Sequence, residues 1–363
     1  MRIDEAFFQD PYPRYDEHRR TGPVRVDMPD GTRPWLLTRH ADVVAALAHQ
    51  HLSSAIAPTG MMSHTDAPEH TRLRALVVRA FGARRVDALR PRVEAITEEL
   101  LDAWAGRDEV DLVATYAIPL PLRVIGELMG LPPADHVVLR RLTDDLVHPE
   151  RMGDAYVRLA EHLARFAAAK EPGDDLTTAL LADRDAGLLT DTELVAMLVL
   201  LITAGHETTV QLIGNGVLAL LRNPDRWAEL VADPDLAPAA VDELLRFDGP
   251  ISPGVLRVAT ADVALGGVVI PAGDLVLISV AAANRDPERF PDPGALTFGR
   301  GAHLAFGHGA HYCLGARLAR LEGEVALTAL LRRYPRTTLA GGGVTWRHAI
   351  SRGVTALPVR PAG

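Results

Sequence analysis

The chain has 363 residues, 48% hydrophobic and 23% charged, so it can form a large core and is neither disordered nor fibrous. Its formal net charge is −9, and an acidic chain lacks the broad basic field that a nucleic-acid partner requires. The single cysteine excludes an intramolecular disulfide and a Cys-x-x-Cys metal cluster, and it indicates a reducing, cytoplasmic environment.

The N-terminal segment does not resemble a secretory leader. Residues 1–8 carry acids where such a leader has its apolar run. The longest uncharged apolar run, residues 194–205, is too short to span a bilayer and predicts a buried core helix. We therefore expect a soluble protein with no membrane partner.

Hydrophobic periodicity predicts a mostly helical protein. Helical spacing is found at residues 41–49, 69–80, 86–104, 155–169, 192–221, 237–247 and 316–334. Short β-like runs occur at residues 24–26, 35–38, 255–258, 263–265, 268–270 and 275–280. We expect strands from both ends of the chain to share a sheet. Because no linker, repeat or charge block divides the middle, residues 1–363 predict one domain, mainly α with a smaller β-rich lobe.

The longest predicted helix contains the sequence AGHETT at residues 204–209, which places an acid beside an alcohol in an apolar segment. Ala204 and Gly205 are small enough to leave room above a flat cofactor. Thr208 can donate to the carbonyl four residues earlier and open the helix into a groove, so Glu207 and Thr208 can deliver protons. The plainer interpretation is an acid at a helix contact and a threonine that packs.

Glu243 and Arg246 lie three residues apart in the predicted helix 237–247 and can form an ion pair on one face. Most such pairs are solvated surface contacts worth about a few tenths of a kcal/mol. By themselves they indicate no function.

The sequence FGHGAHYCLGA at residues 306–316 surrounds the only cysteine. Its glycines permit tight turns, so backbone amides can face inward and stabilise a thiolate at Cys313, while Phe306 can close over the sulfur. Such a loop can supply an axial ligand to a haem iron. The plainer interpretation is a buried cysteine that acts as a small apolar residue.

The pattern Phe-x-x-Gly-x-x-x-Cys-x-Gly, at Phe306, Gly309, Cys313 and Gly315, resembles the haem-ligand loop of the cytochrome P450 family. The resemblance implies a soluble, bacterial-type cytochrome P450 fold in which Cys313 ligates the iron of haem b. It implies a monooxygenase of secondary metabolism that hydroxylates or epoxidises a small to medium organic substrate. O2 is then activated with electrons from NAD(P)H that arrive through a separate ferredoxin reductase and ferredoxin.

The resemblance also gives roles to the two acidic motifs. The family's acid and alcohol lie over the distal haem face and supply protons, which implies these roles for Glu207 and Thr208. The family's Glu-x-x-Arg pair is buried and joined by a further arginine, which makes Glu243, Arg246 and Arg300 a structural trio. Leu296 and Thr297 stand where Phe-Asp is usual, which loosens the register assigned to Arg300.

Haem carries two carboxylates that need cations or hydrogen-bond donors. His70 and Arg74 share a helical face and resemble the family's His-x-x-x-Arg clamp, although Ala67 replaces a common proline. Arg257 and His311 resemble the third and fourth contacts. Taken singly, each is expected to be a surface residue.

Electron donors must be separate proteins, because the chain carries no flavin or iron–sulfur motif. A cluster of arginines flanks the segments expected on the thiolate side, and it is either a docking patch for an acidic ferredoxin or a set of solvated helix faces. These are Arg72, Arg79, Arg84, Arg85, Arg317 and Arg320.

The chain is shorter than expected for the family, between residues 53 and 66 and between residues 139 and 173. Those regions resemble the roof of the active site, so we expect an open pocket for a bulky, peptide-like or carrier-bound substrate. We expect the substrate to lie against residues 200–205 and 251–256. Three alternatives stay open: oxidative coupling of aromatic rings, a haem-based gas sensor without turnover, and a peroxide-driven enzyme.

Overall fold

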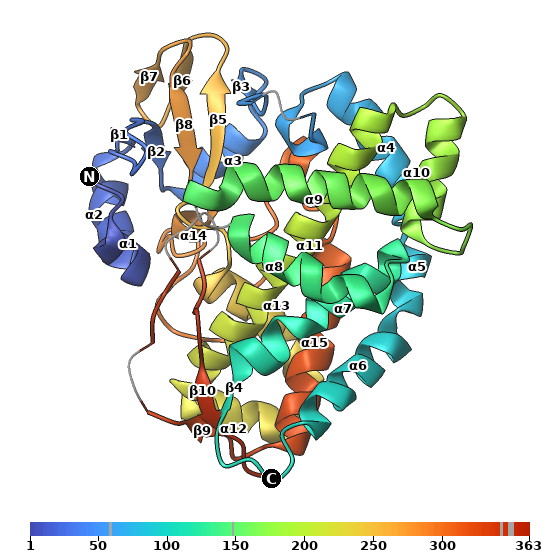
Figure 1. The fold of residues 1–363 in the computed structure, drawn as a ribbon. Helices are drawn as coiled ribbons and strands as arrows, with labels where there is room; N and C mark the ends of the chain where they lie inside the picture. Colours follow the sequence, from blue (N-terminus) through green and yellow to red (C-terminus); the bar gives the residue numbers. More distant parts are fainter. Residues whose placement is uncertain (58–59, 147–148, 342–343, 348–351) are drawn as a thin grey trace.

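The structure is a computed structural model that describes residues 1–363 except 58–59, 147–148, 342–343 and 348–351. Helices form most of the described chain and lie beside a smaller β-rich lobe (Figure 1). This arrangement confirms the predicted fold class.

Helix α11 (Asp191–Leu221) is the central element of the helical lobe (Figure 1). It begins at a capping box, in which Thr190 Oγ1 accepts from the Glu193 amide and the Glu193 carboxylate accepts from the Thr190 amide. Its apolar sequence is explained by its neighbours, because it packs against α7 (Pro119–Met129), α9 (Pro149–Ala169), α13 (Ala237–Asp248) and α15 (Ala316–Arg333).

Among the helices that the structure describes, α11 is the one long and apolar enough to cross a membrane by length and composition. Within the fold, however, 67% of its most apolar window is buried. That burial is typical of the core helix of a globular protein and agrees with the core helix predicted for residues 194–205.

The remaining helices surround this core. The helix predicted over residues 86–104 is wrong as one element, because the chain forms two helices there. Pro91 lies in the first turn of the second helix, where its missing amide hydrogen leaves no partner unsatisfied, whereas inside a longer helix it would break the ladder. The helices that surround the core are α3 (His40–Leu47), α4 (Glu69–Ala80), α5 (Ala83–Ala88), α6 (Arg90–Asp102), α8 (His136–Leu146), α10 (Leu176–Asp185) and α12 (Pro224–Ala232).

The β lobe joins strands near the start of the chain with strands after residue 250, as predicted. Its five-stranded sheet has the order β1-β2-β8-β5-β3, and β2 pairs in parallel with β8, with Trp35 opposite Val276. Helices α1 (Glu5–Gln9), α2 (Tyr12–Thr21) and α14 (Val280–Ala283) complete this side of the molecule (Figure 1). The strands are β1 (Val24–Arg25), β2 (Trp35–Leu37), β3 (Leu52–Ser53), β5 (Val255–Ala259) and β8 (Leu275–Ile278), and β6 (Val263–Leu265) pairs with β7 (Val268–Ile270).

A second small sheet lies at the other end of the molecule, where β10 (Pro358–Arg360) pairs with β4 (Val110–Asp111) and β9 (Thr338–Leu339). Before β10 the chain folds back on itself. The Arg347 amide donates to the Gly353 carbonyl at 2.8 Å and the Thr355 amide donates to the Thr345 carbonyl at 3.0 Å. We call residues 345–355, described without 348–351, the C-terminal hairpin.

Candidate active site

The cysteine loop lies directly before α15 and is shaped by its glycines. Gly307 and Gly309 have φ of +74° and +75°, a region that favours glycine. A Cβ at Gly309 would lie 3.2 Å from the Leu47 carbonyl oxygen, so glycine also lets the loop approach the end of α3. The Cys313 amide donates to the Phe306 carbonyl at 2.9 Å, which closes the loop.

Cys313 is an exposed residue, yet the surrounding protein desolvates its thiol. Burial raises the pKa of the Cys313 thiol, while the Gly315 and Ala316 amides and two arginines act in the opposite direction. Phe306 is buried behind the loop, where the Arg320 guanidinium lies 4.5 Å from its ring centroid. The contact expected between Phe306 and the sulfur stays a prediction.

The four residues predicted to hold carboxylates converge beside this loop. The His70 and His311 rings stack with centroids 3.9 Å apart, and the Arg74 guanidinium donates to the Tyr312 carbonyl at 2.6 Å. His311 Nε2 lies 2.9 Å from Ser54 Oγ. Helix α4 is thereby attached to the residue that precedes Cys313.

This cluster carries more positive than negative groups. Burial lowers the pKa of Arg257 and of His70, and burial together with His70 and Arg257 lowers the pKa of His311 to about 4. The Asp66 carboxylate acts against this effect of burial, because its negative charge raises the pKa of Arg257, His70 and His311. Desolvated cations and donors next to an accessible thiol fit a group that brings one thiolate-binding metal and two carboxylates, as haem does.

The distal motif lies on α11, which runs as a continuous α-helix through it. Thr208 Oγ1 donates to the Ala204 carbonyl at 2.8 Å, as predicted. Ala204 is exposed, but a Cβ at Gly205 would lie 3.2 Å from Ile125 Cδ1. The small size of Gly205 therefore lets α7 approach α11, which differs from the predicted room above a cofactor.

Glu207 has partners that the sequence did not reveal. Its Oε1 accepts from Gln211 Nε2 at 2.8 Å and from the Arg347 guanidinium. The Glu207 and Arg347 side chains are only 15% and 14% exposed. The four-residue spacing of Glu207 and Gln211 is a local signal, whereas nothing local points to Arg347, which is 140 residues away.

The predicted structural trio is assembled. Arg246 donates twice to the Glu243 carboxylate, both at 2.7 Å, and Arg300 Nε lies 3.5 Å from Glu243 Oε1. The Glu243 and Arg246 side chains are each 1% exposed. The Thr297 amide donates to Glu243 Oε1 at 2.8 Å, so the unusual residues before Arg300 do not displace it.

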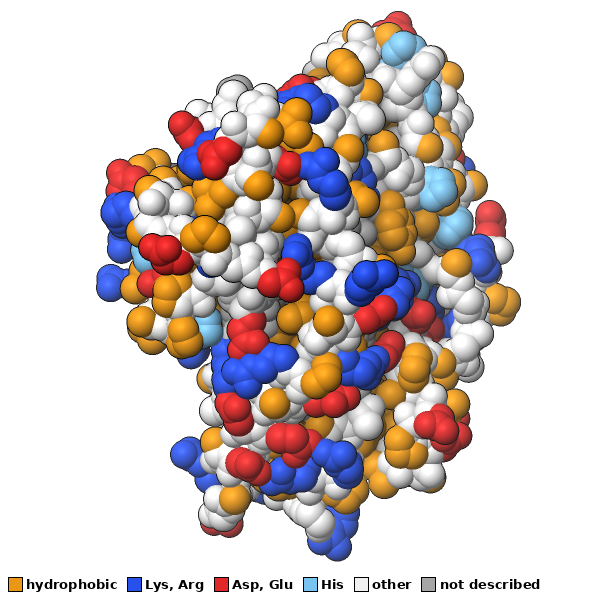
Figure 2. Space-filling model, turned by 90° about the vertical axis from the view of Figure 1, so that its right-hand side faces the viewer, with side chains coloured by type: hydrophobic (Ala, Val, Ile, Leu, Met, Phe, Trp, Pro, Cys, Tyr) orange, Lys and Arg blue, Asp and Glu red, His pale blue; other side chains and the backbone are white. Residues whose placement is uncertain are grey.

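The surface arginines do not form a uniform basic patch. Figure 2, which shows the right-hand side of Figure 1, displays acidic and basic side chains intermixed over this face. The ion pairs explain the mixture: Arg72 with Glu69 and Glu193, Arg79 with Asp183, Arg85 with Asp174, Arg317 with Asp87, and Arg320 with Asp242.

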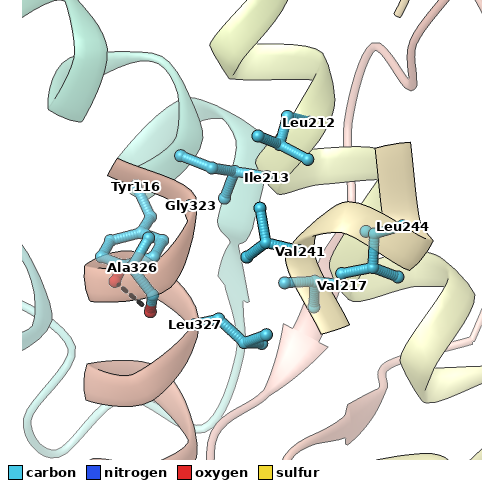
Figure 3. A pocket seen from close by; sticks show the side chains of 10 residues that line it. Tyr116, Leu212, Ile213, Val217, Val241, Leu244, Gly323, Ala326 and Leu327 are labelled. Carbon is cyan, nitrogen blue, oxygen red and sulfur yellow. Dashed lines mark hydrogen bonds between the residues drawn. The ribbon is translucent and has the colours of Figure 1, made fainter. Parts of the chain in front are cut away.

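An apolar cavity of about 20 Å³ lies between α11, α13 and α15 (Figure 3). Leu212, Val241 and Leu327 face into it, and Tyr116 closes one side by donating to the Ala326 carbonyl at 2.7 Å. None of its lining residues belongs to the predicted substrate segments, residues 200–205 and 251–256. This cavity is thus a packing gap of the core, and the position of the substrate stays a prediction.

Known proteins resemble this chain over almost its full length. A family model described as Cytochrome P450 matches residues 228–344. Cytochrome P450 107B1 of Saccharopolyspora erythraea is 45% identical over 394 aligned positions, which cover 99% of this chain and 97% of the relative. Because that alignment is longer than this chain of 363 residues, the relative has residues without a counterpart here.

Two solved structures show the same fold. The tirandamycin C-bound P450 monooxygenase TamI is 41% identical, with a TM-score of 0.93 over 99% of this chain and 100% of that one. P450BioI in complex with hexadec-9Z-enoic acid ligated acyl carrier protein is 30% identical, with a TM-score of 0.92 over 98% and 99% of the two chains.

Proposed function

The chain belongs to the cytochrome P450 family, and from this premise we propose how its own residues support the reaction of a haem-dependent monooxygenase of secondary metabolism. The chemistry that bound haem supplies is reductive activation of dioxygen with electrons from separate redox proteins, followed by oxidation of an organic substrate. Loss of two hydrogens by aromatic coupling, the alternative, is not favoured by the relatives.

Cys313 would hold the haem iron through its thiolate, and the loop from Phe306 to Gly315 would protect the sulfur. The observation that carries this proposal is the meeting of one accessible thiol with the desolvated cluster of His70, Arg257 and His311. Donation by the Gly315 and Ala316 amides favours the thiolate over the thiol once a metal cation offsets the cost of burial.

His70, Arg74, Arg257 and His311 bind the haem carboxylates. A pair of carboxylates would offset the charge of Arg74 and of the desolvated Arg257 and would accept hydrogen bonds from the two imidazoles. Ala204 is exposed and leaves accessible space on α11.

Glu207 and Thr208 would deliver protons. The Thr208 hydroxyl donates to the Ala204 carbonyl, so its oxygen can accept from a water molecule in the accessible space next to Ala204. The Glu207 carboxylate lies one residue before it and can exchange protons with that water. Glu243, Arg246 and Arg300 anchor the segment that leads to the cysteine loop.

The active site admits a bulky or carrier-bound substrate. Between β3 and α4 the described chain forms only the short helix Met62–His64, and a relative has residues without a counterpart in this chain, which agrees with a short roof. A related P450 binds a fatty acid attached to its acyl carrier protein. Residues 200–205 and 251–256 line the pocket.

The protein works as one domain, residues 1–363, in the cytoplasm, where a ferredoxin reductase and an acidic ferredoxin supply its electrons. The main sheet joins strands from residues 24–53 with strands from residues 255–278, and β10 near the C-terminus pairs with β4, which supports a single domain. Arg317 and Arg320 lie on α15 directly after the cysteine loop, and Arg74 attaches α4 to Tyr312, which supports docking of ferredoxin near these helices.

The test of the haem site is the absorption spectrum of the dithionite-reduced protein with carbon monoxide, for wild type and Cys313→Ala. We expect a strongly red-shifted Soret band in the wild type, because thiolate ligation produces that shift, and its loss in the variant. A band that is unchanged by the substitution would contradict ligation by Cys313.

The substrate proposal is tested by haem spectral titration with three probes: tirandamycin C, free hexadec-9Z-enoic acid and the same acid on an acyl carrier protein. Tighter binding of tirandamycin C or of the carrier-bound acid than of the free acid supports an open site. Binding of the free acid alone would refute it.

A further inference from the structure

Helix α11 carries a polar row that the proposed chemistry does not account for. Glu207, Gln211 and Asn215 follow each other at four-residue spacing and so share one face of the helix. Gln211 and Asn215 are 1% and 2% exposed in a helix whose other buried residues are almost all apolar. Burying two amides requires partners with matched donors and acceptors.

Asn215 has partners in the C-terminal hairpin, besides the Asp248 carbonyl, to which its Nδ2 donates at 3.2 Å. Asn215 Nδ2 donates to the Arg352 carbonyl at 3.0 Å, and the Val354 amide donates to Asn215 Oδ1 at 3.3 Å. Gly353 lies so close to Gln211 that a Cβ there would fall 1.4 Å from Gln211 Oε1. The polar row thus fixes the hairpin in register against α11.

The register determines the position of Arg347. Asn215 binds residues 352 and 354, and the Arg347 amide donates to the Gly353 carbonyl between them. These contacts bring the Arg347 side chain to Glu207, the first residue of the polar row. Its guanidinium donates to Glu207 Oε1, the oxygen that also accepts from Gln211 Nε2 at 2.8 Å. Two donors on one carboxylate oxygen, in a pair that is about 15% exposed, restrict the directions that the carboxylate can take.

We propose that Arg347 is a positioning residue for proton delivery, which together with Gln211 holds the Glu207 carboxylate in the orientation from which it serves the water at Thr208. The proposal rests on the proposed role of Glu207. For each proton delivered, Glu207 takes one proton from bulk water and passes it to the water at Thr208, which restores the carboxylate. Arg347 exchanges no proton and acts only through Glu207.

The test measures where consumed dioxygen goes in the haem-loaded protein, with NADPH, a surrogate ferredoxin and its reductase as electron source. No substrate is needed, because dioxygen leaves either as hydrogen peroxide after two protons or as two waters after four. Slower proton delivery increases the peroxide fraction. The variants are Glu207→Gln, Arg347→Met, their double variant, Arg347→Lys and Gln211→Met, with Arg158→Met on the exposed face of α9 as the matched control.

We expect Arg347→Met to raise the peroxide fraction about threefold or more, Gln211→Met to raise it less, and Arg347→Lys to stay near wild type. The double variant should be no worse than Glu207→Gln alone, because Arg347 acts only through Glu207. Urea unfolding of wild type, Glu207→Gln, Arg347→Met and the double variant provides a readout independent of turnover. There too the double variant should lose less stability than the sum of the losses in the two single variants.

Two failures are distinguishable. If Glu207→Gln leaves the peroxide fraction unchanged, the proposed role of Glu207 is wrong and the inference with it. If Glu207→Gln raises the fraction but Arg347→Met either has no effect or adds fully to it, the function stands and the positioning role of Arg347 is overturned. Should Arg347→Met not fold, Arg347→Gln takes its place and is judged by the same criterion.

Discussion

Two buried glutamates show how differently a charge is tolerated in this core. Glu243 is 1% exposed and receives two hydrogen bonds from Arg246, one from the Thr297 amide and the charge of Arg300. Glu322 on α15 is also 1% exposed, but its Oε2 has no hydrogen-bond partner in the described structure. A compensated carboxylate is a structural anchor, whereas an uncompensated one becomes easier to protonate.

Glu243→Gln should destabilise the protein by about 3 kcal/mol, because it leaves Arg246 as a buried cation without its carboxylate. Asp154→Asn is the control, since the Arg158–Asp154 pair at 3.5 Å is exposed and should change stability by about 0.5 kcal/mol or less. Urea unfolding of the haem-loaded proteins measures both. Equal effects of the two substitutions would show that the buried pair is not an anchor.

Glu322 makes stability depend on pH. Burial raises the pKa of Glu322 well above its ordinary value of 4.5, so between that value and the raised one the folded state binds more protons than the unfolded state. The stability due to its protonated form is therefore present below about 4.5 and is lost as the pH rises. We expect Glu322→Gln, which stays neutral, to unfold at higher urea than wild type at pH 8 and at nearly equal urea at pH 5. A difference between the two proteins that does not vary with pH would argue against a buried, titrating Glu322.

At the level of elements, sequence periodicity located those with a clean pattern. Helix α4 and strands β6 and β7 have the predicted bounds, because each ends where the apolar repeat ends. Periodicity failed where a proline starts a new helix inside a continuing pattern, as at Pro91. It also missed short helices such as α12, whose apolar face is completed only by packing in the fold.

The candidate site divides in the same way. Cys313 and its glycines, and the helical pair His70 and Arg74, could be predicted because their spacing along the chain is their signal. The second partner of Glu207 could not, since Arg347 reaches it through a hairpin whose register depends on Gln211 and Asn215. Contacts fixed by tertiary register leave no trace in local periodicity.

The packing of the C-terminal hairpin on α11 can be tested by a clash and its relief. Gly353→Ala should destabilise the protein by about 1–3 kcal/mol, because the new methyl group would overlap the Gln211 side chain. In a Gln211→Ala background, where that side chain is absent, the same substitution should cost much less. Urea unfolding of the four proteins gives the comparison, and a cost of Gly353→Ala that is the same in both backgrounds would contradict the close approach of hairpin and helix.

For the whole molecule, the net charge is −9, and some of the acidic residues lie next to the arginines near the cysteine loop. Several of these arginines are bound by an acid on a neighbouring element, as Arg317 of α15 is by Asp87 of α5, with 2.6 Å between Arg317 Nη2 and Asp87 Oδ2. An acidic ferredoxin would therefore meet cations that are partly neutralised. Such neutralisation limits the affinity of docking and its dependence on salt.

Removing that neutralisation should strengthen docking. Asp87→Asn frees Arg317 without changing a residue of the haem site, so we expect an acidic surrogate ferredoxin to bind about two- to fivefold more tightly at low ionic strength. The gain should disappear at high salt, because exposed charges are screened there. Asp154→Asn on α9 makes the same change in net charge on another exposed surface and should leave the affinity nearly unchanged. Calorimetric titration at two salt concentrations measures these affinities. Equal gains in affinity for both variants would mean that net charge alone governs binding. No gain in affinity for Asp87→Asn would place the ferredoxin away from α5 and α15.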